Sequence, residues 1–145
     1  DKVLEQSRDN PVYYVQYASA RIHSVFRKAD EAGITFDKKL AMNEQFETVT
    51  HEAEIKIAKK LAEWPRLVEI AARTNEPHRI AFYLYELAGD FHSLWNKGNE
   101  ISELRFVQED NHRASCIKMA MISAVLVVIS SGLDILGVEP ATHMN

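Results

Sequence analysis

The chain has 145 residues, of which 46% are hydrophobic and 26% are charged, and this balance is typical of one folded domain rather than of a disordered or collagen-like chain. Its formal net charge is −4, so a nucleic-acid site would have to be a local basic patch on an acidic protein. The single cysteine, Cys116, excludes a disulfide within the chain and fits a reducing, cytoplasmic setting. The sequence begins at Asp1 with no recognisable secretory signal. We expect 1–145 to be one domain, a fragment of a longer protein.

Apolar residues recur with helical spacing along most of the chain, and no segment has a convincing strand pattern. Asn10 and Pro11 predict the start of a long helix, because asparagine caps helices and proline suits the first helical position. Gly33 predicts its end. Other expected features are a short helical turn at 3–4, a helical piece at 39–47, a cap at Thr50, a break at Trp64-Pro65, a helix start at 75–77, a stop at Gly98, and a last helix from 110–111 to Gly137.

These elements predict an all-α fold, a helical bundle of about five helices. The last helix contains the longest uncharged run, 119–133. A membrane span needs about 20 apolar residues, so we interpret this segment as a buried core helix and expect no membrane association.

No motif for catalysis, metal binding or a cofactor is present in the chain. None of the six histidines has a partner at a recognised ligand spacing, and one cysteine cannot build a zinc site. Neither a glycine-rich phosphate loop nor a Gly-x-Ser-x-Gly motif occurs. Cys116 falls in an apolar helix, where a thiol is usually inert packing. We therefore expect no catalytic residue, cofactor site or metal site in this chain.

The first long helix has two distinct faces when each residue is advanced by 100°. Its core face consists of Val15, Ala18, Ile22, Val25, Phe26 and Ala29. A neighbouring flank carries Tyr14, Tyr17, Arg21, Ser24 and Lys28. Tyrosine rings can stack on unpaired bases and arginine can contact phosphate, so this flank is a candidate nucleic-acid surface. The alternative is that both tyrosines only widen the core.

A second aromatic group lies on the helix expected after Pro77. Its core stripe consists of Ile80, Leu84, Leu87, Phe91 and Leu94. Trp95 falls one turn after Phe91, at the edge of this stripe. At such an edge an indole either presents a face to a ligand or seals the core, and the spacing leaves both open.

Several segments resemble the C-terminal domain of arginyl-tRNA synthetases. The run 9–21, Asp-Asn-Pro-Val-Tyr-Tyr-Val-Gln-Tyr-Ala-Ser-Ala-Arg, closely resembles the segment that opens this domain. Segments 84–88 and 91–96 resemble the helix that follows, and 131–137 with Pro140 and Met144 resembles the family's C-terminus. The matches keep their order, whereas 33–75 resembles no segment we can name.

The resemblance implies an all-α bundle that binds the anticodon stem and loop of an arginine tRNA. In the family, the residues matching Tyr14, Tyr17, Arg21, Phe91 and Trp95 are anticodon-loop positions, and a chain-terminal methionine, matched most nearly by Met144, lies at the tRNA surface. The chain departs from the family at Phe91, where some members have tyrosine, at Lys118, where arginine is usual, and at 141–143, where three residues rather than two separate Pro140 from the methionine.

By this resemblance, the parent enzyme would join arginine to tRNA with ATP and magnesium, using motifs that these 145 residues lack. The expected partners are the arginine tRNA and the parent's catalytic domain, with a monomer as the expected state. The alternative function is a helical protein-interaction module without nucleic-acid binding. The two differ in whether Tyr14, Tyr17 and Arg21 face solvent together, because a protein-interaction module needs an apolar groove instead.

Overall fold

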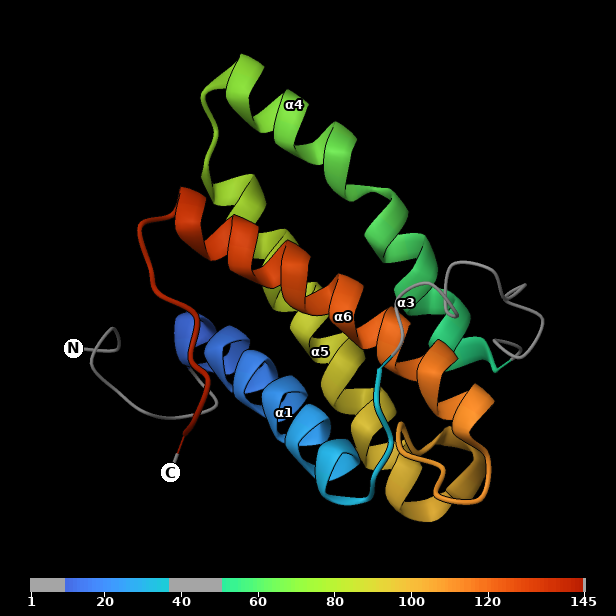
Figure 1. The fold of residues 1–145 in the computed structure, drawn as a ribbon. Coiled ribbons are helices and arrows are strands. Elements are labelled where there is room, and N and C mark those ends of the chain that lie inside the picture. Colours follow the sequence, from blue (N-terminus) through green and yellow to red (C-terminus); the bar gives the residue numbers. More distant parts are fainter. Residues whose placement is uncertain (1–9, 37–50, 145) are drawn as a thin grey trace.

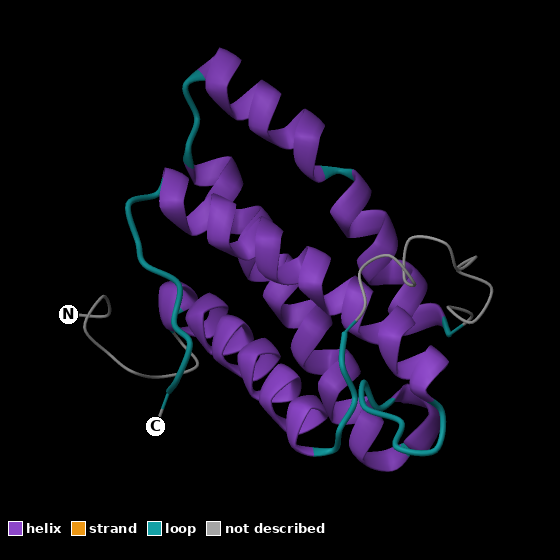
Figure 2. Cartoon of the chain, in the orientation of Figure 1, coloured by secondary structure: helices purple, strands orange, loops and turns teal. Residues whose placement is uncertain are grey.

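A computed structural model describes residues 10–36 and 51–144, and within these ranges the chain consists of helices and loops without a strand (Figure 2). The elements are α1 (Pro11–Glu31), α3 (Glu52–Ala62), α4 (Trp64–Thr74), α5 (His78–Glu100), the short 3-10 helix η2 (Ser102–Leu104) and α6 (His112–Ile135). Helices α1, α5 and α6 lie along one another, while α3 and α4 cover the other side of α5 (Figure 1). The predicted all-α bundle is confirmed.

The predicted start and end of α1 are confirmed by its capping contacts. The Asn10 side-chain oxygen accepts hydrogen bonds from the backbone N–H groups of Val12 (3.0 Å) and Tyr13 (3.4 Å). Gly33 has a φ of 75°, a left-handed conformation that suits a residue just beyond a helix. The capping contacts thus fix where the aromatic flank of α1 begins.

The structure corrects one boundary and leaves others outside its described ranges. The predicted stop at Gly98 is wrong, because α5 continues to Glu100. Gly98 is buried, and its carbonyl accepts a hydrogen bond from Arg105 Nε at 3.0 Å, so it marks where the following loop packs on α5. The helical pieces expected at 3–4 and 39–47 and the cap at Thr50 lie outside the described residues. His51 caps α3 instead, accepting from the Ala53 N–H at 3.1 Å.

Helix α5 forms the centre of the bundle and contacts each of the other described helices. Its predicted core stripe is confirmed, since all five members are buried: Ile80, Leu84, Leu87, Phe91 and Leu94. Gly132 of α6 is packed closely against this stripe, because a Cβ at that position would lie 2.6 Å from Leu84 Cδ1. This close approach brings α5 and α6 together in the core.

Helix α6 has the length and composition of a membrane span, with a mean hydropathy of 2.0 over its most apolar 18 residues. In the fold, 61% of that window is buried inside the bundle. This burial agrees with the prediction of a core helix. Length and composition alone do not distinguish a buried core helix from a membrane span.

A buried ion pair joins α3 to α6. Lys118 Nζ lies 3.0 Å from Glu54 Oε2, and the two side chains are only 8% and 4% exposed. Breaking such a pair is costly because the remaining partner is left charged in the interior.

We predict that Lys118→Met lowers the free energy of unfolding by about 3–5 kcal/mol, because Glu54 loses its buried partner. The double variant Glu54→Leu/Lys118→Met should recover most of this loss, since no uncompensated charge then remains. Urea denaturation followed by circular dichroism checks both variants. Equal stability of the single variant and the unchanged chain would contradict the assigned role of the pair.

Candidate nucleic-acid interface

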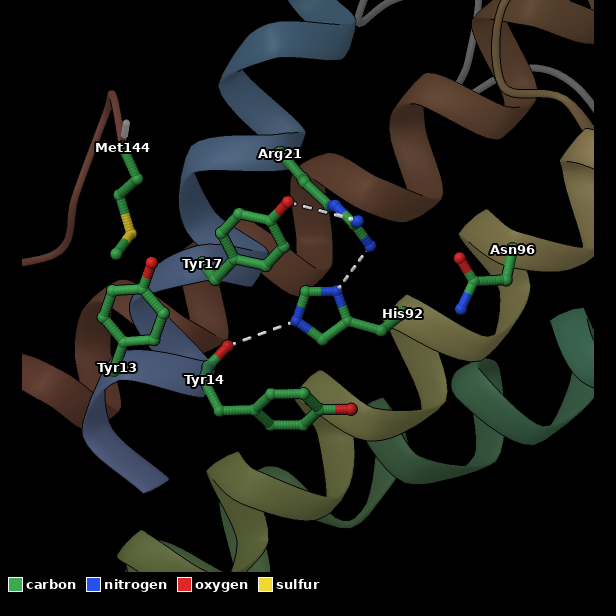
Figure 3. Close-up of a pocket in the computed structure, with 7 residues that line it drawn as sticks. All are labelled: Tyr13, Tyr14, Tyr17, Arg21, His92, Asn96 and Met144. Carbon is green, nitrogen blue, oxygen red and sulfur yellow. Dashed lines mark hydrogen bonds between the residues drawn. The ribbon is translucent and has the colours of Figure 1, made fainter. Parts of the chain in front are cut away.

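A pocket of about 470 Å³ opens between α1, α5 and the C-terminal tail (Figure 3). Its lining is mostly aromatic and polar: Tyr13, Tyr14, Tyr17, Arg21, His92, Asn96 and Met144. Tyr14, Tyr17 and Arg21, which share one flank of α1, therefore do meet at one surface. This is the arrangement that distinguishes the nucleic-acid interpretation from the protein-interaction alternative.

The Arg21 guanidinium is held from several sides. Its Cζ lies 4.5 Å from the centre of the Tyr17 ring and 4.9 Å from that of Trp95, so the planar cation sits against two aromatic faces. Arg21 Nη2 donates to the Tyr17 hydroxyl at 3.3 Å, and Nη1 donates to His92 Nδ1 at 3.0 Å. None of the ion pairs found between described residues includes Arg21. The site thus presents a positioned positive charge without a carboxylate partner from the described part of the chain.

His92 lies beneath this cation and is 4% exposed. Its Nε2 lies 3.2 Å from the Tyr14 carbonyl oxygen, and its ring centre lies 4.6 Å from that of Tyr14 and 5.4 Å from that of Tyr17. The sequence analysis did not predict this role, because it found no partner for any histidine at a recognised ligand spacing. His92 directly follows the buried Phe91 in the chain. This position beside the core stripe is the feature of the sequence that indicates burial of His92.

The tyrosines extend the aromatic surface on both sides of His92. The rings of Tyr13 and Tyr17 are parallel to within 10°, with centres 6.3 Å apart. The Tyr14 ring lies on the other side and contacts Tyr85 at 5.1 Å between centres (Figure 3). Tyr13 was missed because it falls outside the flank defined by helical periodicity, although it neighbours Tyr14 in the chain.

The structure separates the two aromatic residues predicted on α5. Trp95 is only partly buried. The Arg21 guanidinium lies against one face of its ring, and Lys28 Nζ lies 5.8 Å from the ring centre. Phe91 is 0% exposed and stacks on Phe106, with ring centres 5.7 Å apart and planes within 7°. Because Phe91 has no accessible surface, the expected direct contact with a loop is corrected to a supporting position behind Trp95.

The C-terminal tail crosses α1 (Figure 1), and its residue Met144 lines one side of the pocket. Three side chains of α1 donate to carbonyl oxygens of the tail: Gln16 to Glu139 (3.0 Å), Ser19 to Ala141 (2.7 Å) and Arg27 to Thr142 (3.3 Å). Met144 then reaches the pocket beside Tyr13 and Tyr17 (Figure 3). The structure thus brings Met144 together with Tyr14, Tyr17 and Arg21 at one pocket.

His23 of α1 lies near two basic residues, Arg27 of the same helix and His143 of the tail. Burial lowers the pKa of His23, and the neighbouring positive charges of Arg27 and His143 lower it further. His23 therefore becomes charged only at a pH below the usual range for histidine.

Within the described ranges, no group of three or more histidine, cysteine, aspartate or glutamate residues could hold a metal ion. The side chains that line the pocket can recognise a ligand. Aromatic faces offer stacking, Arg21 offers a cation, and the amide of Asn96 offers a hydrogen-bond donor and acceptor.

The fold and the pocket together define an all-α domain suited to a ligand that combines planar rings with negative charge. The chain belongs to the DALR anticodon binding domain family, whose model matches residues 15–144. The expectation drawn from the sequence resemblance is thereby confirmed at the level of the family.

Similar proteins include two curated bacterial relatives that carry the name arginine–tRNA ligase. The relative from Ruegeria pomeroyi is 63% identical over 145 residues, and that from Roseobacter denitrificans is 58% identical over the same length. Each match covers 100% of this chain and 25% of the relative, so the chain spans about a quarter of the length of these proteins.

A crystal structure described as an arginyl-tRNA synthetase from Campylobacter jejuni shares the fold. It superposes with a TM-score of 0.76 at 24% sequence identity, covering 99% of this chain and 28% of that one. At this identity the likeness supports the fold alone.

We predict that Phe91→Ala lowers the free energy of unfolding by about 3–5 kcal/mol, because it leaves a cavity in the core. Phe82 provides a matched control in the same helix, since it is 68% exposed, and Phe82→Ala should change stability by no more than about 0.5 kcal/mol. Urea denaturation of both variants checks the comparison. A stable Phe91→Ala domain with weakened RNA binding would restore a direct contact role for Phe91.

Proposed function

We propose that this chain binds the anticodon stem and loop of an arginine tRNA, as the C-terminal domain of an arginine–tRNA ligase. The observation that carries the proposal is the Arg21 guanidinium, fixed between the rings of Tyr17 and Trp95 without a carboxylate partner in the described residues. A fixed cation beside partly exposed rings, without a carboxylate partner in the described residues, suits a ligand that offers phosphates and unstacked bases together.

The pocket chemistry supports a single-stranded RNA ligand over a helical one. Sequence-specific RNA recognition usually involves loops whose bases are splayed out and stacked on aromatic or guanidinium planes. The stacked pair Tyr13 and Tyr17 and the partly exposed Trp95 provide such planes along α1 and α5. Arg21 lies between these two groups of rings, where a backbone phosphate could meet it.

In this proposal, the joining of arginine to the tRNA is carried out by the parent protein. The relatives are named arginine–tRNA ligases and are about four times as long as this chain. The catalytic domain of the parent would join arginine to the tRNA using ATP and magnesium, and this domain would position the tRNA for that reaction. We further propose a cytoplasmic, monomeric parent, with the catalytic domain as this domain's partner within the chain.

Binding to tRNA transcripts tests the proposal directly. All arginine codons of the standard code have a central G, so the anticodon base most useful to read is its central C. We expect the chain to bind an arginine-tRNA transcript at low salt more tightly than a transcript with this C replaced. Fluorescence anisotropy measures both affinities. If neither transcript binds to the chain or to the full-length parent, the proposed function is wrong.

Tyr17→Ala should weaken binding of the arginine-tRNA transcript by about 5- to 150-fold, because one base–ring stack contributes about 1–3 kcal/mol. Tyr17→Phe is the matched control, since it keeps the ring and removes only the hydroxyl. It should lose less affinity than Tyr17→Ala, because it removes only the hydrogen bond from Arg21 Nη2 and keeps the ring for stacking. Circular dichroism must show folded protein in both variants, and normal binding by Tyr17→Ala would remove Tyr17 from the interface.

A further inference from the structure

We propose that His92 is a positioning residue for the proposed RNA site, because it fixes the Arg21 guanidinium through a single neutral tautomer. This inference rests on the proposed function for its consequence, since the group that it holds is the cation assigned to phosphate. His92 belongs to α5 and Arg21 to α1, so the contact also crosses the interface between the two helices.

The two hydrogen bonds of His92 determine which ring nitrogen carries the proton. Arginine can only donate, so Nδ1 must accept the hydrogen bond from Arg21 Nη1 at 3.0 Å. A backbone carbonyl oxygen can only accept, so Nε2 must donate to Tyr14 at 3.2 Å. A neutral imidazole with its proton on Nε2 satisfies both contacts, whereas a proton on Nδ1 would remove the acceptor that Arg21 uses.

The surroundings of His92 prevent the ring from turning away from Arg21. The side chain is 4% exposed and lies between the rings of Tyr14 and Tyr17. The Phe91 ring lies edge-on at 5.7 Å between centres. A ring confined in this way presents Nδ1 to Arg21 in one direction.

Arg21 needs such an anchor to be positioned. Its stacking against Tyr17 and Trp95 fixes the plane of the guanidinium but leaves rotation within that plane less restricted. The contacts from Nη1 to His92 and from Nη2 to the Tyr17 hydroxyl fix the direction within the plane. Among the described residues, these two contacts use one N–H bond of each Nη and leave the other N–H bonds of the guanidinium for a ligand.

Two substitutions separate the two hydrogen bonds of His92. In His92→Asn, the amide oxygen is bonded to Cγ, as Nδ1 is in histidine. It can therefore still accept the hydrogen bond from Arg21. In His92→Gln, the terminal amide is one bond further from the backbone, at the level of Nε2. It can donate to the Tyr14 carbonyl oxygen, but it offers Arg21 no acceptor at the position of Nδ1. His112→Gln is a matched control, because His112 is exposed at the start of α6.

The first measurement follows Arg21 in the free domain by nitrogen-15 NMR of the guanidinium groups. We expect slow rotation of the Arg21 guanidinium, with separate Nη signals, in the unchanged chain and in His92→Asn. His92→Gln should show faster rotation and merged signals. Identical Arg21 signals in all of these proteins would overturn the proposal. This readout uses no RNA, so its result is independent of the proposed function.

The second measurement is the salt dependence of binding to the arginine-tRNA transcript. If Arg21 meets one phosphate, Arg21→Ala should flatten the slope of log affinity against log salt by about 0.7. His92→Gln should flatten it similarly and weaken binding by about tenfold, whereas His92→Asn and His112→Gln should keep the original slope. An unchanged slope in Arg21→Ala would contradict the phosphate contact, and the NMR result alone would then decide the role of His92.

The double variant distinguishes positioning from general stabilisation of the fold. If His92 acts through Arg21, His92→Gln should weaken binding about tenfold in the unchanged chain and hardly at all in the Arg21→Ala background. An equal loss in both backgrounds would show that His92 acts independently of Arg21 and would overturn the proposal. Urea denaturation of each variant ensures that folded proteins are being compared.

Discussion

The packing of α1 on α5 is the constraint on which the candidate site depends. Burial of the apolar stripe of α5, which includes Phe91 and Leu94, sets the rotation of this helix in the bundle. The next residue after each of these, His92 and Trp95, is then turned towards α1 because successive helical residues differ by 100°. Both therefore meet Arg21 from α5. The core that stabilises the bundle thus also places two of the groups that hold the cation.

Much of this architecture follows from the sequence alone. Helical periodicity predicts the core face of α1 and the flank with Tyr14, Tyr17 and Arg21, because both are properties of a single helix. Contacts between helices depend on their relative rotation and register, which periodicity does not give. His92 was therefore missed as the partner of Arg21, and Phe91 was assigned to the ligand although it lies entirely in the core.

The distribution of charge explains how an acidic chain can present a cationic site. Several carboxylates outside the pocket are engaged with lysine or arginine side chains, as in the pairs Lys60–Glu86 and Arg73–Glu69 on the surface and Lys118–Glu54 in the interior. Among the described residues, those that line the pocket include one arginine and no carboxylate. A net charge of −4 therefore describes the whole chain but not this surface.

The C-terminal tail places Met144 in the pocket although the spacing between Pro140 and Met144 differs from the one that the resemblance implied. By the sequence resemblance, residues 141–143 add one residue to the spacing expected between Pro140 and the methionine. Two of these residues offer their carbonyl groups to α1, Ala141 to Ser19 and Thr142 to Arg27, so the tail is held along the helix before it turns into the pocket. Met144 reaches the tyrosines because these backbone contacts, rather than the count of residues after Pro140, set its position.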